Sequence, residues 1–193
     1  MTERFRRGLG WLAVGSVAYH VLAMVALHVL QPEVSPLSAM VGAYLAGPYQ
    51  TLSRTTFLAF ALAFGALAVG VGSSLTGRRS FAATALLGFS ALGFGGVFLF
   101  PERVTQVGAV VRPITLATML RLSLVLRREP RWAPRGGGLV VVSVSLVLLF
   151  VVTFGWLLDL GLGGLANRVV LVLIYIWIVL VAWGLFGAPQ DLG

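Results

Sequence analysis

The segment Gln31–Arg54, QPEVSPLSAMVGAYLAGPYQTLSR, separates the first two long apolar runs of the chain. Ser35 is a favourable helix N-cap, and Pro36 suits the first helical position, where its missing N–H costs nothing. Apolar side chains then recur at helical spacing until a Gly-Pro pair at 47–48, which stops a helix. The pattern predicts a short amphipathic helix, Pro36–Ala46, which is too short to cross a bilayer and should lie at its interface.

The composition places the chain in a membrane. Of its 193 residues, 59% are hydrophobic and only 10% are charged, whereas soluble domains carry about 25% charged residues. There is no cysteine, which excludes disulfides and thiolate chemistry. The net charge of +8 lies in loops beside apolar runs, as the positive-inside rule requires. We therefore expect membrane lipids as partners and no nucleic acid.

The apolar runs predict an all-α bundle of six transmembrane helices in a single domain, because backbone polar groups in lipid must be satisfied within each segment. The expected spans are about 9–30, 51–75, 81–100, 106–126, 139–158 and 168–186, followed by a short polar tail at 187–193. The first run is too long for a signal-peptide core, so we expect it to be retained. In the fourth span, Pro113 is expected to kink a helix that neighbouring helices accommodate.

Small residues four positions apart recur in two of these spans. Ala61 and Gly65 lie in the second, and Ala91 and Gly95 in the third. Such pairs let helix backbones approach closely in lipid. Packing within one bundle is favoured over a dimer motif, and the oligomeric state is left open.

The distribution of arginine predicts the orientation. Six spans place both termini on one side of the membrane, and nine arginines lie on that side: Arg4, Arg6, Arg7, Arg78, Arg79, Arg127, Arg128, Arg131 and Arg135. The loops of the other side hold four: Arg54, Arg103, Arg112 and Arg168. The positive-inside rule then makes both termini cytoplasmic in a bacterial inner membrane.

Charged residues at the outer helix ends are the candidate ligand-binding site. A bundle would bring six of them to one mouth: His28, Arg54, Glu102, Arg112, Asp159 and Arg168. The forked donors of arginine suit an anionic head group or a carboxylate-bearing ligand. A structural salt-bridge network that locks the helix ends is the alternative.

Arg112 is the member of this set that enters the apolar zone, because it precedes Pro113 within the fourth span. An unpaired charge at that depth costs about 2.5–3.5 kcal/mol. We therefore expect a carboxylate partner, with Asp159 as the first choice and Glu102 as the second. The helix Pro36–Ala46 is expected to cover the pocket.

No catalytic, metal or cofactor site is evident. His20 and His28 are the two histidines, and eight residues on one helix place them about 80° apart around the axis and about 12 Å along it. One metal ion does not easily take both, and haem would need a ligand from a facing helix. His20 is expected to be a hydrogen-bonded packing residue.

Three motifs resemble a known family. They are SPLSAMVGAYLAGPYQTLSRTTF at 35–57, FPER at 100–103 and GLANR at 164–168. They are similar to signatures of the bacterial "domain of unknown function 998" membrane family. This chain has Arg54 where the family usually has asparagine, and Arg103 where it usually has aspartate. The resemblance implies six helices and membrane residence and attaches no activity.

These observations favour a non-enzymatic membrane protein, either a lipid- or small-ligand-binding module or an accessory subunit of a membrane-protein partner. A small-solute or proton-coupled transporter that uses Asp159 or Glu102 is the alternative. An intramembrane enzyme is a third hypothesis. Broken helices in paired positions would favour transport, and Pro113 has no counterpart in the other half.

Single cysteines will test the orientation, because there is no native cysteine to remove. We expect a membrane-impermeant maleimide to label Ser38→Cys from outside intact cells and Arg131→Cys only after lysis. The reverse pattern would contradict the topology.

Overall fold

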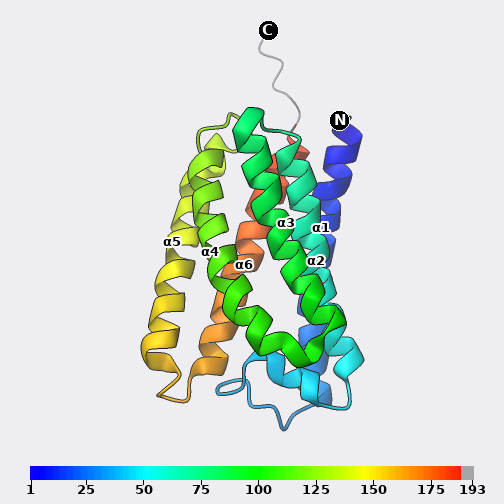
Figure 1. Ribbon diagram of the computed structural model, residues 1–193, viewed down its shortest axis with the longest axis vertical. Coiled ribbons are helices and arrows are strands. Elements are labelled where there is room, and N and C mark those ends of the chain that lie inside the picture. The colour runs from blue at the N-terminus through cyan, green and yellow to red at the C-terminus, as the bar shows by residue number, and fades with distance from the viewer. Residues whose placement is uncertain (188–193) are drawn as a thin grey trace.

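The computed structural model describes residues 1–187, with the backbone alone at 79–80 and 154–155. The predicted polar tail falls almost wholly outside the described residues. Six long helices form one bundle (Figure 1). They are α1 Glu3–Leu30, α2 Gln50–Gly72, α3 Gly77–Leu99, α4 Val104–Leu126, α5 Gly136–Val152 and α6 Gly163–Phe186. Each belongs to a helical segment long and apolar enough to cross a membrane, which confirms the all-α class.

The helix bounds differ from the predicted spans by up to six residues. α1 begins at Glu3, because Thr2 caps it by accepting a hydrogen bond from the Phe5 amide. α4 begins at Val104 and contains Pro113, as expected. α5 is followed directly by a π-helical turn, Thr153–Leu157, which continues the segment toward α6.

The helices are arranged as a closed ring. α2 lies between α1 and α3, α4 lies between α3 and α5, and α6 closes the ring by packing on both α5 and α1. α6 also touches α2. Figure 1 shows that α1 begins and α6 ends at one end of the bundle, here called the terminal end. The connection between α1 and α2, residues 31–49, lies at the other end, here called the loop end.

Large apolar side chains fill the centre of the bundle. Phe64 and Leu67 of α2, Met119 of α4, and Trp177 of α6 are fully buried in one cluster. The outer surface is also apolar: Leu92, for example, is 77% exposed. A bundle that is apolar inside and outside is typical of helices surrounded by lipid.

Three helices share a buried polar contact. The indole N–H of Trp177 donates to the Ser123 hydroxyl at 2.8 Å, and the Ser123 and Ser143 hydroxyls are 2.8 Å apart. These residues belong to α6, α4 and α5 respectively. In lipid, such interhelical hydrogen bonds add specificity to van der Waals packing.

The small residues of α2 and α3 face one another. A Cβ at Gly65 would lie 3.9 Å from the Cβ of Ala91, and a Cβ at Gly95 would lie 3.8 Å from that of Ala61. The two pairs therefore pack reciprocally within one chain, as expected from their spacing. This surface brings the two backbones close together.

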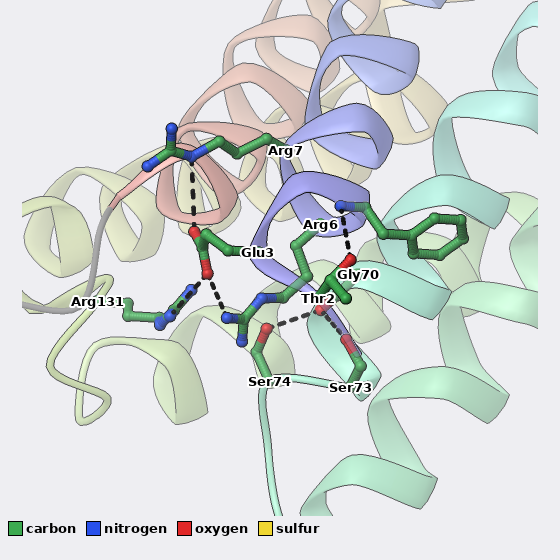
Figure 2. Close-up of polar contacts among 9 residues, drawn as sticks. Thr2, Glu3, Arg6, Arg7, Gly70, Ser73, Ser74 and Arg131 are labelled. Atoms are coloured by element: carbon green, nitrogen blue, oxygen red, sulfur yellow. Dashed lines mark hydrogen bonds and ion pairs between the residues drawn. The ribbon is translucent and has the colours of Figure 1, made fainter.

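An ion-pair cluster closes the terminal end (Figure 2). The Glu3 carboxylate pairs with Arg6, lies 3.7 Å from Nε of Arg7, and lies 3.4 Å from Nη2 of Arg131. Arg131 belongs to the α4–α5 connection, so the carboxylate ties this connection to the first turn of α1. Glu3 thus holds two arginines of α1 and one arginine of the connection.

At the terminal end, Trp132 packs against α6. It is 1% exposed, and its indole donates to the Val181 carbonyl at 3.0 Å. A Cβ at Gly184 would lie 1.9 Å from the Trp132 Nε1, so Gly184→Ala must displace the ring. We expect destabilisation by about 1–3 kcal/mol, measured as a lower Tm in detergent. Gly65→Ala is the matched control, and an equal loss in both variants would contradict this packing.

Candidate ligand-binding site

Arg168 holds the loop end together. Its Nη1 donates to the Ala39 carbonyl at 2.9 Å and to the Gly164 carbonyl at 3.0 Å, and its Nη2 donates to the Tyr44 hydroxyl at 3.4 Å. Its Nε donates to Nε2 of His28 at 3.1 Å. One guanidinium of α6 therefore joins α1, the 31–49 loop and its own helix.

The hydrogen bonds of His28 determine its tautomer. A guanidinium only donates, so Nε2 of His28 must be the acceptor of the Arg168 hydrogen bond. Nδ1 lies 2.6 Å from the Met24 carbonyl and therefore carries the proton. His28 is thus neutral, with both ring nitrogens engaged.

The loop is fastened to α6 by its backbone, and this explains why the predicted helix Pro36–Ala46 is wrong in its first half. In an α-helix, the Leu37 carbonyl would accept from the Val41 amide. Instead, Leu37 accepts from the Leu165 amide at 2.9 Å, and the Val41 amide donates to Oδ1 of Asn167 at 3.1 Å. A 3-10 helix forms only at Val41–Ala46.

Gly164 allows this close approach. A Cβ at this position would lie 2.7 Å from the oxygen and 2.8 Å from the nitrogen of Ala39. These are backbone atoms, which a side-chain rotation cannot relieve. The start of α6 therefore serves as the platform for the loop.

A cavity of about 50 Å³ lies between the helices beside this platform. Its lining residues come from α3, α4, α5 with its π-helical turn, α6 and the loop: Met40, Phe94, Arg112, Thr115, Leu116, Phe150, Thr153, Asn167, Val170 and Ile174. One water needs about 10–15 Å³ of such space. The cavity is therefore large enough for a few waters or for a small head group, and its wall is mainly apolar.

Among the described residues of this lining, Arg112 is the only one with a charged side chain. It is half-buried, and within residues 1–187 its guanidinium makes no hydrogen bond or ion pair. A Cβ at Gly108 would lie 3.4 Å from the guanidinium, so the absence of a side chain there leaves it room. Arg112 and Phe94 also border a second cavity of about 30 Å³.

The expected pairing of Arg112 with Asp159 or Glu102 is wrong. Both carboxylates are exposed to the surroundings of the bundle, and neither lines the cavity. Burying them beside Arg112 would remove their hydration, which costs several kcal/mol per ion. They form part of the rim instead.

Arg54 has a separate role at the end of α3. Its Nε donates to the Phe98 carbonyl at 2.8 Å, and its guanidinium carbon lies 5.4 Å from the centre of the Phe98 ring. The six predicted residues therefore do not form one cluster. His28 and Arg168 are in contact, Arg112 lines the cavity, and the other three lie elsewhere.

The polar residues beside Arg112 in the cavity were not predicted. Thr115 donates to the Ser90 hydroxyl at 2.9 Å, and Thr153 donates to the Leu149 carbonyl at 2.7 Å. Helical spacing could have predicted Thr115 as a neighbour of Arg112, because it follows Arg112 by three positions and thus lies on the same helix face.

His20 packs as expected from the sequence. Its Nδ1 lies 2.6 Å from the Tyr175 hydroxyl, and its ring lies 4.4 Å from that of Phe60. The residue is buried in the middle of α1. It links α1 to α6 away from the cavity.

The fold and cavity define an all-helical, multi-pass membrane bundle whose first loop is fastened over one end. Residues 13–184 match the model of the family described as "Protein of unknown function (DUF998)". The chain belongs to this family, which confirms the resemblance of its motifs. No curated protein and no solved structure matches the chain.

Arg168→Lys tests the fastening of the loop. A lysine keeps the charge but cannot reproduce the planar fork of donors. We expect the free energy of unfolding, measured by thermal melts in detergent, to fall by about 2 kcal/mol, since each hydrogen bond to a charged group contributes about 1.5–3 kcal/mol. Backbone amides at 35–46 should also exchange faster with deuterium. Arg103→Lys, at an exposed side chain of the same end, should change neither measurement.

Proposed function

We propose that this protein binds an amphiphilic anion in the membrane, with its carboxylate or phosphate group on Arg112 and its apolar part against the cavity wall. The observation that carries the proposal is the half-buried guanidinium of Arg112, which has no partner within residues 1–187. A protein that keeps an unpaired arginine among apolar helices requires a compensating group.

The chemistry of the cavity supports an anion with an apolar body. A carboxylate or phosphate accepts two parallel hydrogen bonds from one guanidinium. Phe94, Leu116, Phe150 and Ile174 supply an apolar wall. Because the cavity volume is about 50 Å³, it suits the head group, and the rest of an amphiphile would extend along the outer surface of the helices.

The orientation and location belong to this proposal. The terminal end is placed in the cytoplasm, because its loops carry most of the arginines, and the cavity then opens toward the outer leaflet. A bacterial inner membrane fits this arrangement. An accessory role beside a membrane-protein partner is compatible with ligand binding at this site.

Transport with Asp159 or Glu102 as a proton carrier has less support. Both side chains are exposed at the loop end, and neither lines the cavity. Paired broken helices, which are typical of transporter sites, are also missing among α1 to α6, where Pro113 is the single internal proline.

Native mass spectrometry from a mild detergent tests the binding function. We expect the wild-type protein to retain an acidic lipid or fatty acid, and Arg112→Gln to retain about tenfold less, because a charge-assisted pair is lost. Arg103→Gln removes the same charge at the same end and should retain the ligand.

Thermal melts of delipidated protein separate binding from folding. Without a ligand, Arg112→Leu replaces an unpaired charge with an apolar side chain and should keep or raise the Tm. Undiminished retention by Arg112→Gln, or a strongly lowered Tm of delipidated Arg112→Leu, would contradict the proposed function.

A further inference from the structure

A separate groove lies at the terminal end, between the start of α3 and the last turns of α4. Its volume is about 150 Å³, three times that of the Arg112 cavity. The lining residues are Arg78, Ala82, Ala83, Leu86, Thr118, Arg121, Leu122 and Val125. The described lining therefore combines two arginines and one hydroxyl with apolar side chains, and it includes no acid.

Neither arginine of this groove is neutralised by the protein. Arg78 and Arg121 are exposed, and within the described residues neither side chain makes an ion pair or a hydrogen bond. Glu3, an acid of the same end, is already engaged by Arg6 and its neighbours. Two like charges that share one small groove repel each other, and an anion between them removes this repulsion.

Thr118 provides a second and independent indication of a ligand. Its side chain is 2% exposed, and its hydroxyl has no hydrogen-bond partner in the part of the chain that the structure describes. Ser123 and Thr153, by contrast, donate to the carbonyl four residues earlier, each at 2.7 Å. Threonine in a helix has two accessible χ1 rotamers, so the Thr118 hydroxyl can turn toward a ligand in the groove.

We propose that this groove binds a phosphate group, supplied by an anionic phospholipid of the leaflet at the terminal end. Arg78 and Arg121 would donate to the phosphate oxygens, and the Thr118 hydroxyl would complete the set. Leu86 and Val125 would contact the first methylenes of an acyl chain. Phe81 follows Arg78 by three positions on α3 and is 77% exposed. This site is independent of the function proposed for Arg112.

The test uses the full chain in nanodiscs of one part phosphatidylglycerol to nine parts phosphatidylcholine. Native mass spectrometry measures how much phosphatidylglycerol remains bound after release. We expect Arg78→Gln and Arg121→Gln each to retain about three- to tenfold less than the wild type. Arg128→Gln is the matched control, because it removes the same charge from an exposed, unpaired position of the same end. Equal retention in all three variants would overturn the proposal.

Thr118→Val distinguishes binding from folding. Valine has the shape of threonine with a methyl group in place of the hydroxyl, and that hydroxyl has no hydrogen-bond partner among the described residues. We expect an unchanged or higher Tm together with about threefold weaker retention of phosphatidylglycerol. Retention equal to that of the wild type would contradict a role for the hydroxyl in the site.

Inorganic phosphate in nanodiscs of phosphatidylcholine alone identifies the source of the phosphate group. A lipid site should show no binding of phosphate at millimolar concentration. Phosphate binding that Arg78→Gln and Arg121→Gln abolish would assign the same chemistry to a free anion. The absence of both lipid retention and phosphate binding would overturn the proposal.

Discussion

The arrangement of the loop end depends on the guanidinium of Arg168. It binds a carbonyl of the loop, a carbonyl of its own helix, the hydroxyl of Tyr44 and the ring of His28. A charge near lipid is tolerated when its donors are satisfied, and here the acceptors are dipoles rather than carboxylates. Because this one side chain has four contacts, the loop that it holds becomes a fixed part of the bundle and closes its end beside the cavity.

The two arginines of the loop end differ in what surrounds them. Arg168 is saturated by neighbours, whereas Arg112 faces a mainly apolar cavity without a partner in the described part of the chain. The same contrast occurs at the terminal end, where Glu3 pairs with arginines of α1 and of the α4–α5 connection, whereas Arg78 and Arg121 have no ion-pair partner among the described residues. Charged side chains with partners in the protein therefore stabilise the fold, whereas those without a partner among the described residues are the ones proposed to bind ligands. In a bilayer this separation is informative, because an unpaired charge is costly.

Long apolar runs predicted the helices, since a lipid-facing chain has no alternative to satisfying its backbone within each helix. Spacing also predicted that the small residues of the second and third spans pack within one bundle, as Gly65 does against Ala91. The site was predicted only in part. Sequence places charges at an end of the bundle but does not say which carbonyls they bind. The hydrogen bonds from the Leu165 amide to Leu37 and from the Val41 amide to Asn167 replace the first half of the expected loop helix. The pairing of Arg112 failed because rim carboxylates remain exposed.

The π-helical turn Thr153–Leu157 has a consequence for how this chain can vary in length. In a π turn the amide bonds to the carbonyl five residues earlier, as the Leu158 amide does to Thr153 at 3.2 Å. Such a turn accommodates one residue more than an α-helix does. Deleting a residue here would restore a regular α-helical turn and leave the segments on both sides close to their present orientation, because the π turn already takes up the additional residue. One-residue insertions and deletions among relatives should therefore concentrate at this turn, where they would disturb neither α5 nor the rim.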